Sequence, residues 1–169
     1  MKTLRYYVEL AEADELARRY FVMNAFDGAL TVLGVIVGAF VGGEAEPKVI
    51  ISAGVGASLA MGLSGGIGAY VAERAERSRA LKELETHMFK DLQDTLIGKA
   101  SRAAAYWVAF VDGVSPAIAA LIPLSPLIFA RLTPMPVDLA LSASIVLNLV
   151  TLFALGIFLG KISKESIWL

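Results

Sequence analysis

Cysteine is absent from the sequence, and histidine occurs once, as His87. Without cysteine the chain has no disulfide bonds and no thiolate ligands, so a metal site must use oxygen, imidazole or thioether donors. Charged residues are also scarce, at 18% of the chain, whereas soluble domains have about 25%. Because hydrophobic residues make up 57%, the composition indicates a membrane protein, and nucleic acid is not expected as a partner.

Charge is rarest in four long apolar blocks, within which Asp27 and Asp112 are the only charged residues. The blocks are residues 21–41, 49–72, 103–130 and 139–160. Each is long enough for a helix across a hydrocarbon core of about 30 Å, which takes roughly 20 residues. Barrel strands would be about half as long and would alternate in polarity. The sequence therefore predicts an all-α polytopic membrane protein with four transmembrane helices and a cytosolic helical extension.

Basic residues are divided unevenly if the four blocks cross the bilayer alternately. Thirteen of the 15 lysines and arginines then share one side, and only Lys48 and Arg131 lie on the other. Basic residues stay on the cytosolic side, so both termini of the given chain and the central charged segment are predicted to be cytosolic. No cleavage site of a signal peptide precedes the first block. The expected location is a prokaryotic plasma membrane.

Four parts follow along the chain. They are an amphipathic cytosolic helix (1–20), transmembrane helices 1 and 2 (21–72), a charged cytosolic helix (73–102), and transmembrane helices 3 and 4 with a tail (103–169). Residues 72–101 contain no glycine or proline before Gly98, so one long helix is expected to leave the second span and to turn at 97–98. Three prolines in the third span are expected to kink or break it and to free backbone carbonyls.

Small residues spaced four apart predict close helix contacts in the first two spans. They are Gly34, Gly38 and Gly42 in the first span, and Ser58, Gly62 and Gly66 in the second.

A weak internal repeat relates the two halves of the chain. AFDGALTVLGVIV and AFVDGVSPAIAAL both contain Asp-Gly, and residues 51–68 match 141–158 at an offset of 90. With two spans per unit, such a duplication would be a parallel repeat.

If the halves correspond, Asp27 and Asp112 lie at similar depths on equivalent helices. Burying one charge in a membrane costs about 2.5–3.5 kcal/mol, and two carboxylates side by side also repel each other. A divalent cation between them relieves both costs, and protons can replace it when it leaves. Met61, in the middle of the second span, is a candidate soft ligand. The glycine after each aspartate permits close approach of a neighbouring helix.

Two other interpretations of these residues stay open. Asp27 could cap the first span near the headgroups together with Asn24, and Asp112 could pair with Arg102 or with a backbone donor. Met61 could simply be a packing residue.

The cytosolic helix offers a second group of candidate metal ligands. At about 100° per residue, five side chains fall on one face: Glu76, Glu83, His87, Asp91 and Asp94. The candidate ligands among them are Glu76, Glu83, His87 and Asp91. Carboxylate and imidazole donors suit iron(II), manganese or zinc. Arg79 and Lys90 lie in or beside the same face, so a solvated face with ordinary salt bridges explains the pattern equally. A single helix cannot surround a metal, so this site would need a helix from a second subunit.

In these features the sequence resembles the vacuolar iron transporter family. The shared features are Asp-Gly early in the first span, Ala-Met within the second, the charged helix that follows it, and AFVDGVSPAIAALIPL in the third, over residues 18–160. The resemblance implies a dimeric, proton-coupled exporter of iron(II) and related metals. It implies that Asp27 and Met61 line the translocation path, and that Glu76 and Glu83 collect metal.

The sequence also departs from that family. The family has five spans, a three-helix cytosolic module and an acidic residue soon after the methionine, whereas this sequence predicts four spans, about one cytosolic helix, and Gly65 at that position. The main hypothesis is still proton-coupled export of iron(II) or manganese(II) by a homodimer. The metal is its substrate, no cofactor is needed, and no enzymatic activity is expected. The alternative is a membrane scaffold whose cytosolic helix docks another protein.

Overall fold

The computed structural model describes residues 13–43 and 45–163, and all the regular structure in them is helical. The helices are α2 (Ala13–Val41), α3 (Pro47–Met88), α4 (Leu96–Leu132) and α5 (Val137–Ser163). Each contains a stretch long and apolar enough to cross a membrane. The predicted all-α polytopic fold with four transmembrane helices is therefore confirmed.

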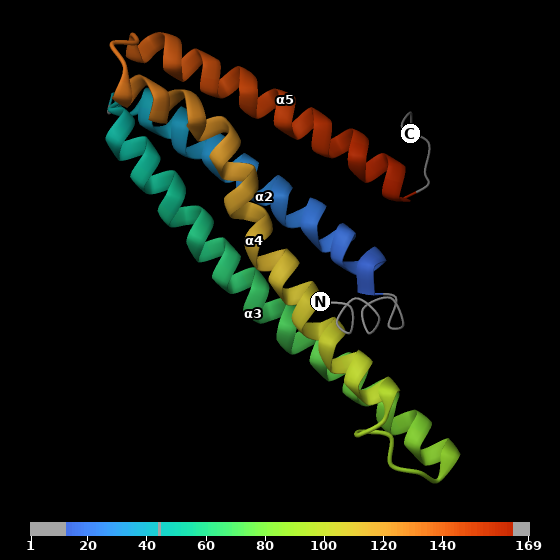
Figure 1. Ribbon diagram of the computed structural model, residues 1–169. Coiled ribbons are helices and arrows are strands. Elements are labelled where there is room, and N and C mark those ends of the chain that lie inside the picture. The colour runs from blue at the N-terminus through green and yellow to red at the C-terminus, as the bar shows by residue number, and fades with distance from the viewer. Residues whose placement is uncertain (1–12, 44, 164–169) are drawn as a thin grey trace.

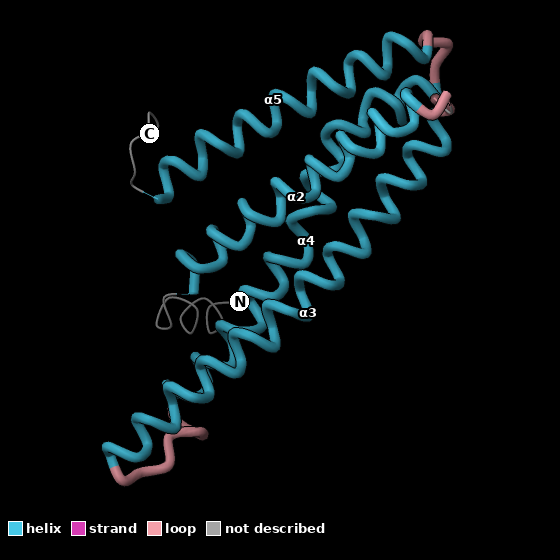
Figure 2. The backbone as a smooth tube through the Cα atoms, turned by 180° about the vertical axis from the view of Figure 1, so that it is seen from behind, coloured by secondary structure: helices cyan, strands magenta, loops and turns pink. Residues whose placement is uncertain are grey.

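α2 and α4 each contact the other three helices, and the contacts of α4 with α3 and α2 are the most extensive in the bundle. Figure 1 shows α3 and α4 side by side toward the connection between them, with α2 packed beside them and α5 on the far side of α2 and α4. In both views α3 and α4 project as a hairpin beyond the start of α2, while α5 diverges from the bundle toward the chain terminus (Figures 1 and 2). We call the end with the connection 89–95 the hairpin end, and the end with the connections 42–46 and 133–136 the turn end.

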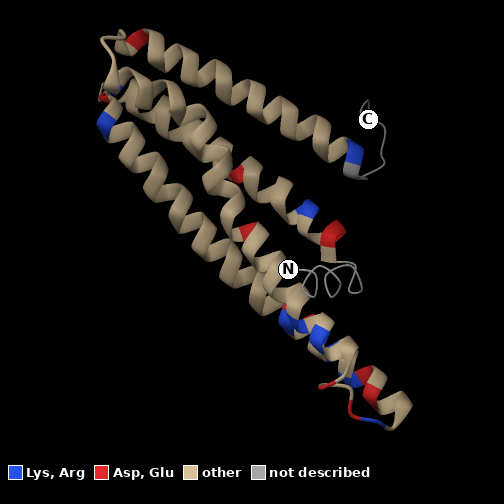
Figure 3. Cartoon of the chain, viewed as in Figure 1, with Lys and Arg blue, Asp and Glu red and all other residues tan. Residues whose placement is uncertain are grey.

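The basic residues gather at the hairpin end (Figure 3). The apolar parts of the four helices carry almost no charge, as expected for segments that cross a lipid core. Residues 13–20, predicted to belong to a separate surface helix, form the first turns of α2 without a break. The rest of that predicted helix, residues 1–12, lies outside the described residues.

The connection between α3 and α4 is not where the sequence predicted it. A single helix was expected to run to residues 97–98, but α3 ends at Met88 and α4 begins at Leu96. Phe89 ends α3 with a left-handed backbone (φ 51°), a conformation that usually requires glycine. With neither glycine nor proline in residues 89–95, the sequence offered no turn residue to mark this position.

Side chains on both helices hold this connection in place. The Glu85 carboxylate accepts a hydrogen bond from the Leu92 backbone N–H at 2.9 Å, and the Thr95 hydroxyl caps α4 by accepting from the Gly98 N–H. Gly98 is buried, and a Cβ added there would lie 2.4 Å from the Gln93 carbonyl oxygen. Gly98 therefore lets the loop pass over the first turn of α4.

α4 remains one helix despite its three internal prolines, and it bends along its length (Figure 1). Pro116 and Pro126 cannot donate to the carbonyls four residues earlier. In each case the preceding serine donates instead: Ser115 bonds the Asp112 carbonyl at 2.8 Å and Ser125 bonds the Ile122 carbonyl at 2.7 Å. The Ser-Pro pairs thus keep a proline-rich span helical.

Close contact between α3 and α4 depends on glycine. Gly62 and Gly113 face each other so closely that a Cβ on Gly62 would lie 2.3 Å from the Gly113 carbonyl oxygen. Gly66 packs one turn further along, which confirms the predicted contact for this part of the second span. Gly34 and Gly38 have nothing within 4 Å of an added Cβ, so the predicted contact is wrong for them within one chain.

Two apolar cores lie at different levels of the bundle. Near the turn end, Val32, Ile36, Ile50, Leu124 and Leu127 are fully buried together with neighbouring alanines. Toward the hairpin end a smaller core joins α2 to α4 through Ala13, Ala17, Ala104 and Val108. Residues 24–31 of α2 lie between these two levels, and it is there that polar side chains enter the bundle.

Candidate functional site

The polar face of α2 is formed by Asn24, Asp27 and Thr31. Their spacings of three and four residues place them on the same side of the helix. Asp27 lies about four turns inside α2, which begins at Ala13. The interpretation of Asp27 as a cap of the first span is therefore wrong.

Asp112 reaches the same level from α4. It is buried, with 1% of its surface exposed, and its carboxylate accepts a hydrogen bond from the Asn24 side-chain amide. Its predicted alternative partner, Arg102, instead donates to the Gln93 carbonyl. Asp27 lies one turn from Asn24 on α2, so it lies near the level of Asp112 in the bundle. The structure thus places the two aspartates that the sequence singled out near the same level of the bundle, one exposed on α2 and the other buried on α4.

Gly65 makes room for this arrangement on α3. A Cβ added to Gly65 would lie 2.8 Å from the Asn24 amide nitrogen and 2.9 Å from an Asp112 carboxylate oxygen. Any larger residue at position 65 would therefore displace the hydrogen-bonded pair. The Asp112 carboxylate from α4 occupies the space that a side chain of α3 would otherwise fill.

The glycine after each aspartate lies at a helix crossing, as predicted. A Cβ on Gly28 would lie 2.6 Å from the Pro116 carbonyl oxygen of α4, and Gly113 meets Gly62 of α3. In each case the small residue lets one helix press against the next immediately beside a carboxylate.

Met61 of α3 adds a thioether sulfur to this group of polar side chains. Its sulfur lies 3.3 Å from the Thr31 hydroxyl, which donates to it. Met61 is one turn from Gly65 on α3, so it faces α2 next to the aspartate pair. We call Asn24, Asp27, Thr31, Met61 and Asp112 the polar cluster. It combines two carboxylates, an amide, a hydroxyl and a thioether on three helices.

Asp27 marks the open side of the polar cluster. It is exposed, whereas Asp112 is buried and Asn24, Thr31 and Met61 are partly buried. Among the described residues no group of three or more acidic, histidine or cysteine side chains could hold a metal ion. Within one chain, a cation at the polar cluster would therefore meet only two charged ligands and would depend on neutral donors for the others.

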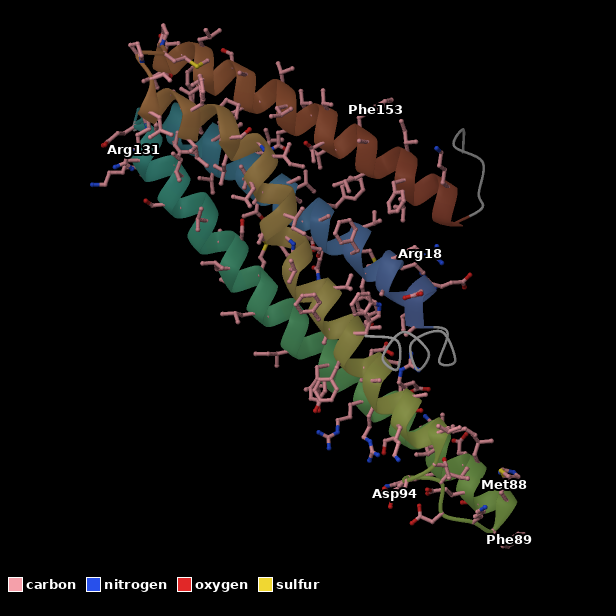
Figure 4. The ribbon with its side chains drawn as sticks, in the orientation of Figure 1. Arg18, Met88, Phe89, Asp94, Arg131 and Phe153 are labelled. Atoms are coloured by element: carbon pink, nitrogen blue, oxygen red, sulfur yellow. The ribbon has the colours of Figure 1, made fainter. Side chains whose placement is uncertain are left out.

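The candidate ligands of the cytosolic helix do not form a site in the structure. Glu83 makes a salt bridge to Arg79 at 3.2 Å, and the His87 ring bonds the Glu83 backbone carbonyl at 2.7 Å. Asp91 lies beyond the end of α3, where it accepts from the Gln93 N–H, so it does not share a helix face with Glu83. Glu76 is exposed. The tip of this hairpin carries Met88, Phe89 and Asp94, far from the bundle (Figure 4).

Two polar residues near the cluster were not among the sequence candidates. Tyr20 lies one turn before Asn24 on α2, and Glu73 lies about two turns beyond Gly65 on α3. Glu73 makes a 3.2 Å salt bridge to Arg77, and its side chain is 12% exposed. Polar groups thus continue from Asp112 toward the hairpin end. Glu73 could have been noticed as the first acid after the second apolar block.

The chain is similar in sequence to known proteins. The model of the VIT family matches residues 18–95. A protein of Methanocaldococcus jannaschii, described as uncharacterized, is 35% identical over 156 residues, covering 90% of this chain and 78% of that protein. No solved structure matches the chain.

Proposed function

This chain belongs to the VIT family of membrane metal-ion transporters, and from that premise we propose that it exports iron(II) or manganese(II) from the cytosol in exchange for protons. The observation that carries the proposal is the buried Asp112 carboxylate within the membrane span, which accepts from Asn24, one turn along α2 from Asp27. Two neighbouring carboxylates repel each other unless a cation or a proton lies between them. Metal and protons therefore compete for one place, which is the requirement for exchange.

The polar cluster suits a first-row divalent ion. Carboxylate, amide and hydroxyl oxygens are ligands for manganese(II) and iron(II), and the Met61 thioether adds a softer donor that magnesium and calcium do not favour. Asp112 takes the place of the acidic residue that the resembled family carries in its second span. In this chain Gly65 leaves that place empty, and α4 supplies the carboxylate to it.

A second copy of the chain would complete the cluster. Asp27 is exposed, and Gly34 and Gly38 follow it along the same helix with nothing packed against them. An exposed carboxylate within a span is costly in lipid, and small residues allow close contact between helices. We therefore propose a homodimer in which these α2 faces approach and the ion passes between the subunits.

The orientation follows from the distribution of charge. The basic residues concentrate at the hairpin end (Figure 3), and basic residues favour the cytosolic side. The hairpin end then faces the cytosol of a prokaryotic cell, and Tyr20 and Glu73 lie between that end and the polar cluster along α2 and α3.

Transport into liposomes tests this function. The purified protein is reconstituted with an acidic lumen containing a metal-quenched dye, and Fe(II), Mn(II), Co(II), Zn(II) or Mg(II) is added outside. We expect uptake of Fe(II) or Mn(II) with loss of luminal protons, and much slower uptake once a protonophore has dissipated the gradient. Uptake unaffected by the gradient would contradict proton coupling. No uptake of any metal by the folded protein would favour the scaffold.

A further inference from the structure

A basic cavity lies between α3 and α4 near the hairpin end. Its volume is about 160 Å³. The charged residues that line it are Arg74, Arg77, Lys82 and Arg102, together with one carboxylate, Glu85. Four cations and one anion on the lining sum to +3, and Glu73, which is salt-bridged to Arg77, reduces the local charge to +2 around a space that can hold a small anion.

The cavity's cations are largely without acidic partners. Arg77 pairs with Glu73, but Arg74 donates to the neutral Tyr70 hydroxyl at 2.9 Å and Arg102 donates to the Gln93 carbonyl at 3.1 Å. Lys82 makes no salt bridge within the described part of the chain. Arg74, Lys82 and Arg102 are all exposed, so their charges are accessible to a ligand.

Glu85 offsets only one of these positive charges. One oxygen of its carboxylate accepts the Leu92 backbone N–H at 2.9 Å, which holds the connection 89–95 against α3. Arg102 holds the same connection through Gln93. The cavity is thus bounded by two helices and by a loop that hydrogen bonds hold in place. The guanidinium and ammonium groups on its lining are the donors available to an anion.

The cavity also lies at the edge of the membrane span. The apolar block of α3 ends at residue 72, just before Arg74, and that of α4 begins at residue 103, just after Arg102. Tyr70 and Tyr106 pair at this level, with ring centroids 5.0 Å apart and hydroxyls 3.2 Å apart. Tyrosine is enriched where a membrane meets water, so the cavity lies at the depth of lipid headgroups.

We propose that this cavity binds a phosphate group, and that the group belongs to the headgroup of an anionic phospholipid. Guanidinium groups bind phosphate oxygens through paired, charge-assisted hydrogen bonds, and basic pockets between transmembrane helices on the cytosolic side suit anionic headgroups. Inorganic phosphate offers the same chemistry from solution. The site is separate from the polar cluster and does not depend on the transport function.

Paired variants test the site. Arg102→Gln/Lys82→Gln removes two cavity cations, whereas Arg79→Gln/Lys99→Gln removes two exposed charges from the same helices outside the cavity. Thermal unfolding is followed in nanodiscs of phosphatidylcholine, with and without phosphatidylglycerol, and separately with inorganic phosphate. Wild type and the control variant should gain stability with phosphatidylglycerol. The cavity variant should lose most of that gain, since each lost charge-assisted bond weakens binding by roughly tenfold.

Native mass spectrometry of the same proteins gives an independent readout. Wild type and the control variant should retain phosphatidylglycerol in preference to phosphatidylcholine, and the cavity variant should not. Stabilisation by inorganic phosphate alone, lost in the cavity variant, would support the phosphate site but overturn the lipid as its source. Equal responses of the cavity and control variants to every addition would overturn the site itself.

Discussion

Replacing Asp112 with asparagine is expected to reduce metal uptake into liposomes by about a hundredfold or more. Loss of a residue that merely orients a metal ligand already costs 10–100-fold in affinity, and here a charged ligand itself is removed. Asparagine has nearly the same shape and keeps an oxygen that can accept from the Asn24 amide, so the helices should still pack. The measurement is the initial rate of Mn(II)-dependent dye quenching.

Asp138→Asn is the matched control for this variant. Asp138 is exposed in the first turn of α5 at the turn end, away from the polar cluster. The same change of one charge there should leave the uptake rate near that of wild type. Uptake at the wild-type rate in Asp112→Asn would remove this carboxylate from the transport path.

Replacing Gly62 with alanine is expected to have the largest effect on stability. The new Cβ would lie 2.3 Å from the Gly113 backbone oxygen, so α3 and α4 must move apart. Overpacking of this kind costs typically 1–3 kcal/mol, and about the upper end is expected here because the obstacle is backbone. The thermal unfolding midpoint in detergent should fall.

Gly68→Ala provides the comparison on the same helix. An added Cβ at Gly68 meets nothing within 4 Å, and alanine favours a helix more than glycine does. Its midpoint should therefore equal or exceed that of wild type. If Gly62→Ala proved as stable as Gly68→Ala, the close α3–α4 contact beside Asp112 would be wrong.

Much of this fold could be predicted because the lipid core imposes simple limits on sequence. Length and apolarity identified four helices, and the confirmed crossings at Gly28 and Gly113 followed from the glycine after each aspartate. The connection at 89–95 could not be predicted, because Phe89 adopts a left-handed conformation without glycine. That error also placed Asp91 on a helix face to which it does not belong.

The sequence identified the charged residues of the candidate site, but it did not identify the neutral side chains that lie beside them. Asp27 and Asp112 stood out because charge is rare in apolar blocks. Asn24 and Thr31 are common residue types, and their part in the cluster depends on how α2, α3 and α4 cross. The significance of Gly65 likewise appears only when Asp112 is seen beside it. The internal repeat of two spans stays a prediction.

Binding of Mn(II) to the purified protein, followed by its paramagnetic resonance, tests most directly whether Asp27 and Asp112 share one ion. We predict that wild type and Asp138→Asn bind Mn(II), that binding weakens as the pH falls and protons take the metal's place, and that Asp27→Asn and Asp112→Asn each abolish it. Equal Mn(II) affinity in all four proteins would contradict the account.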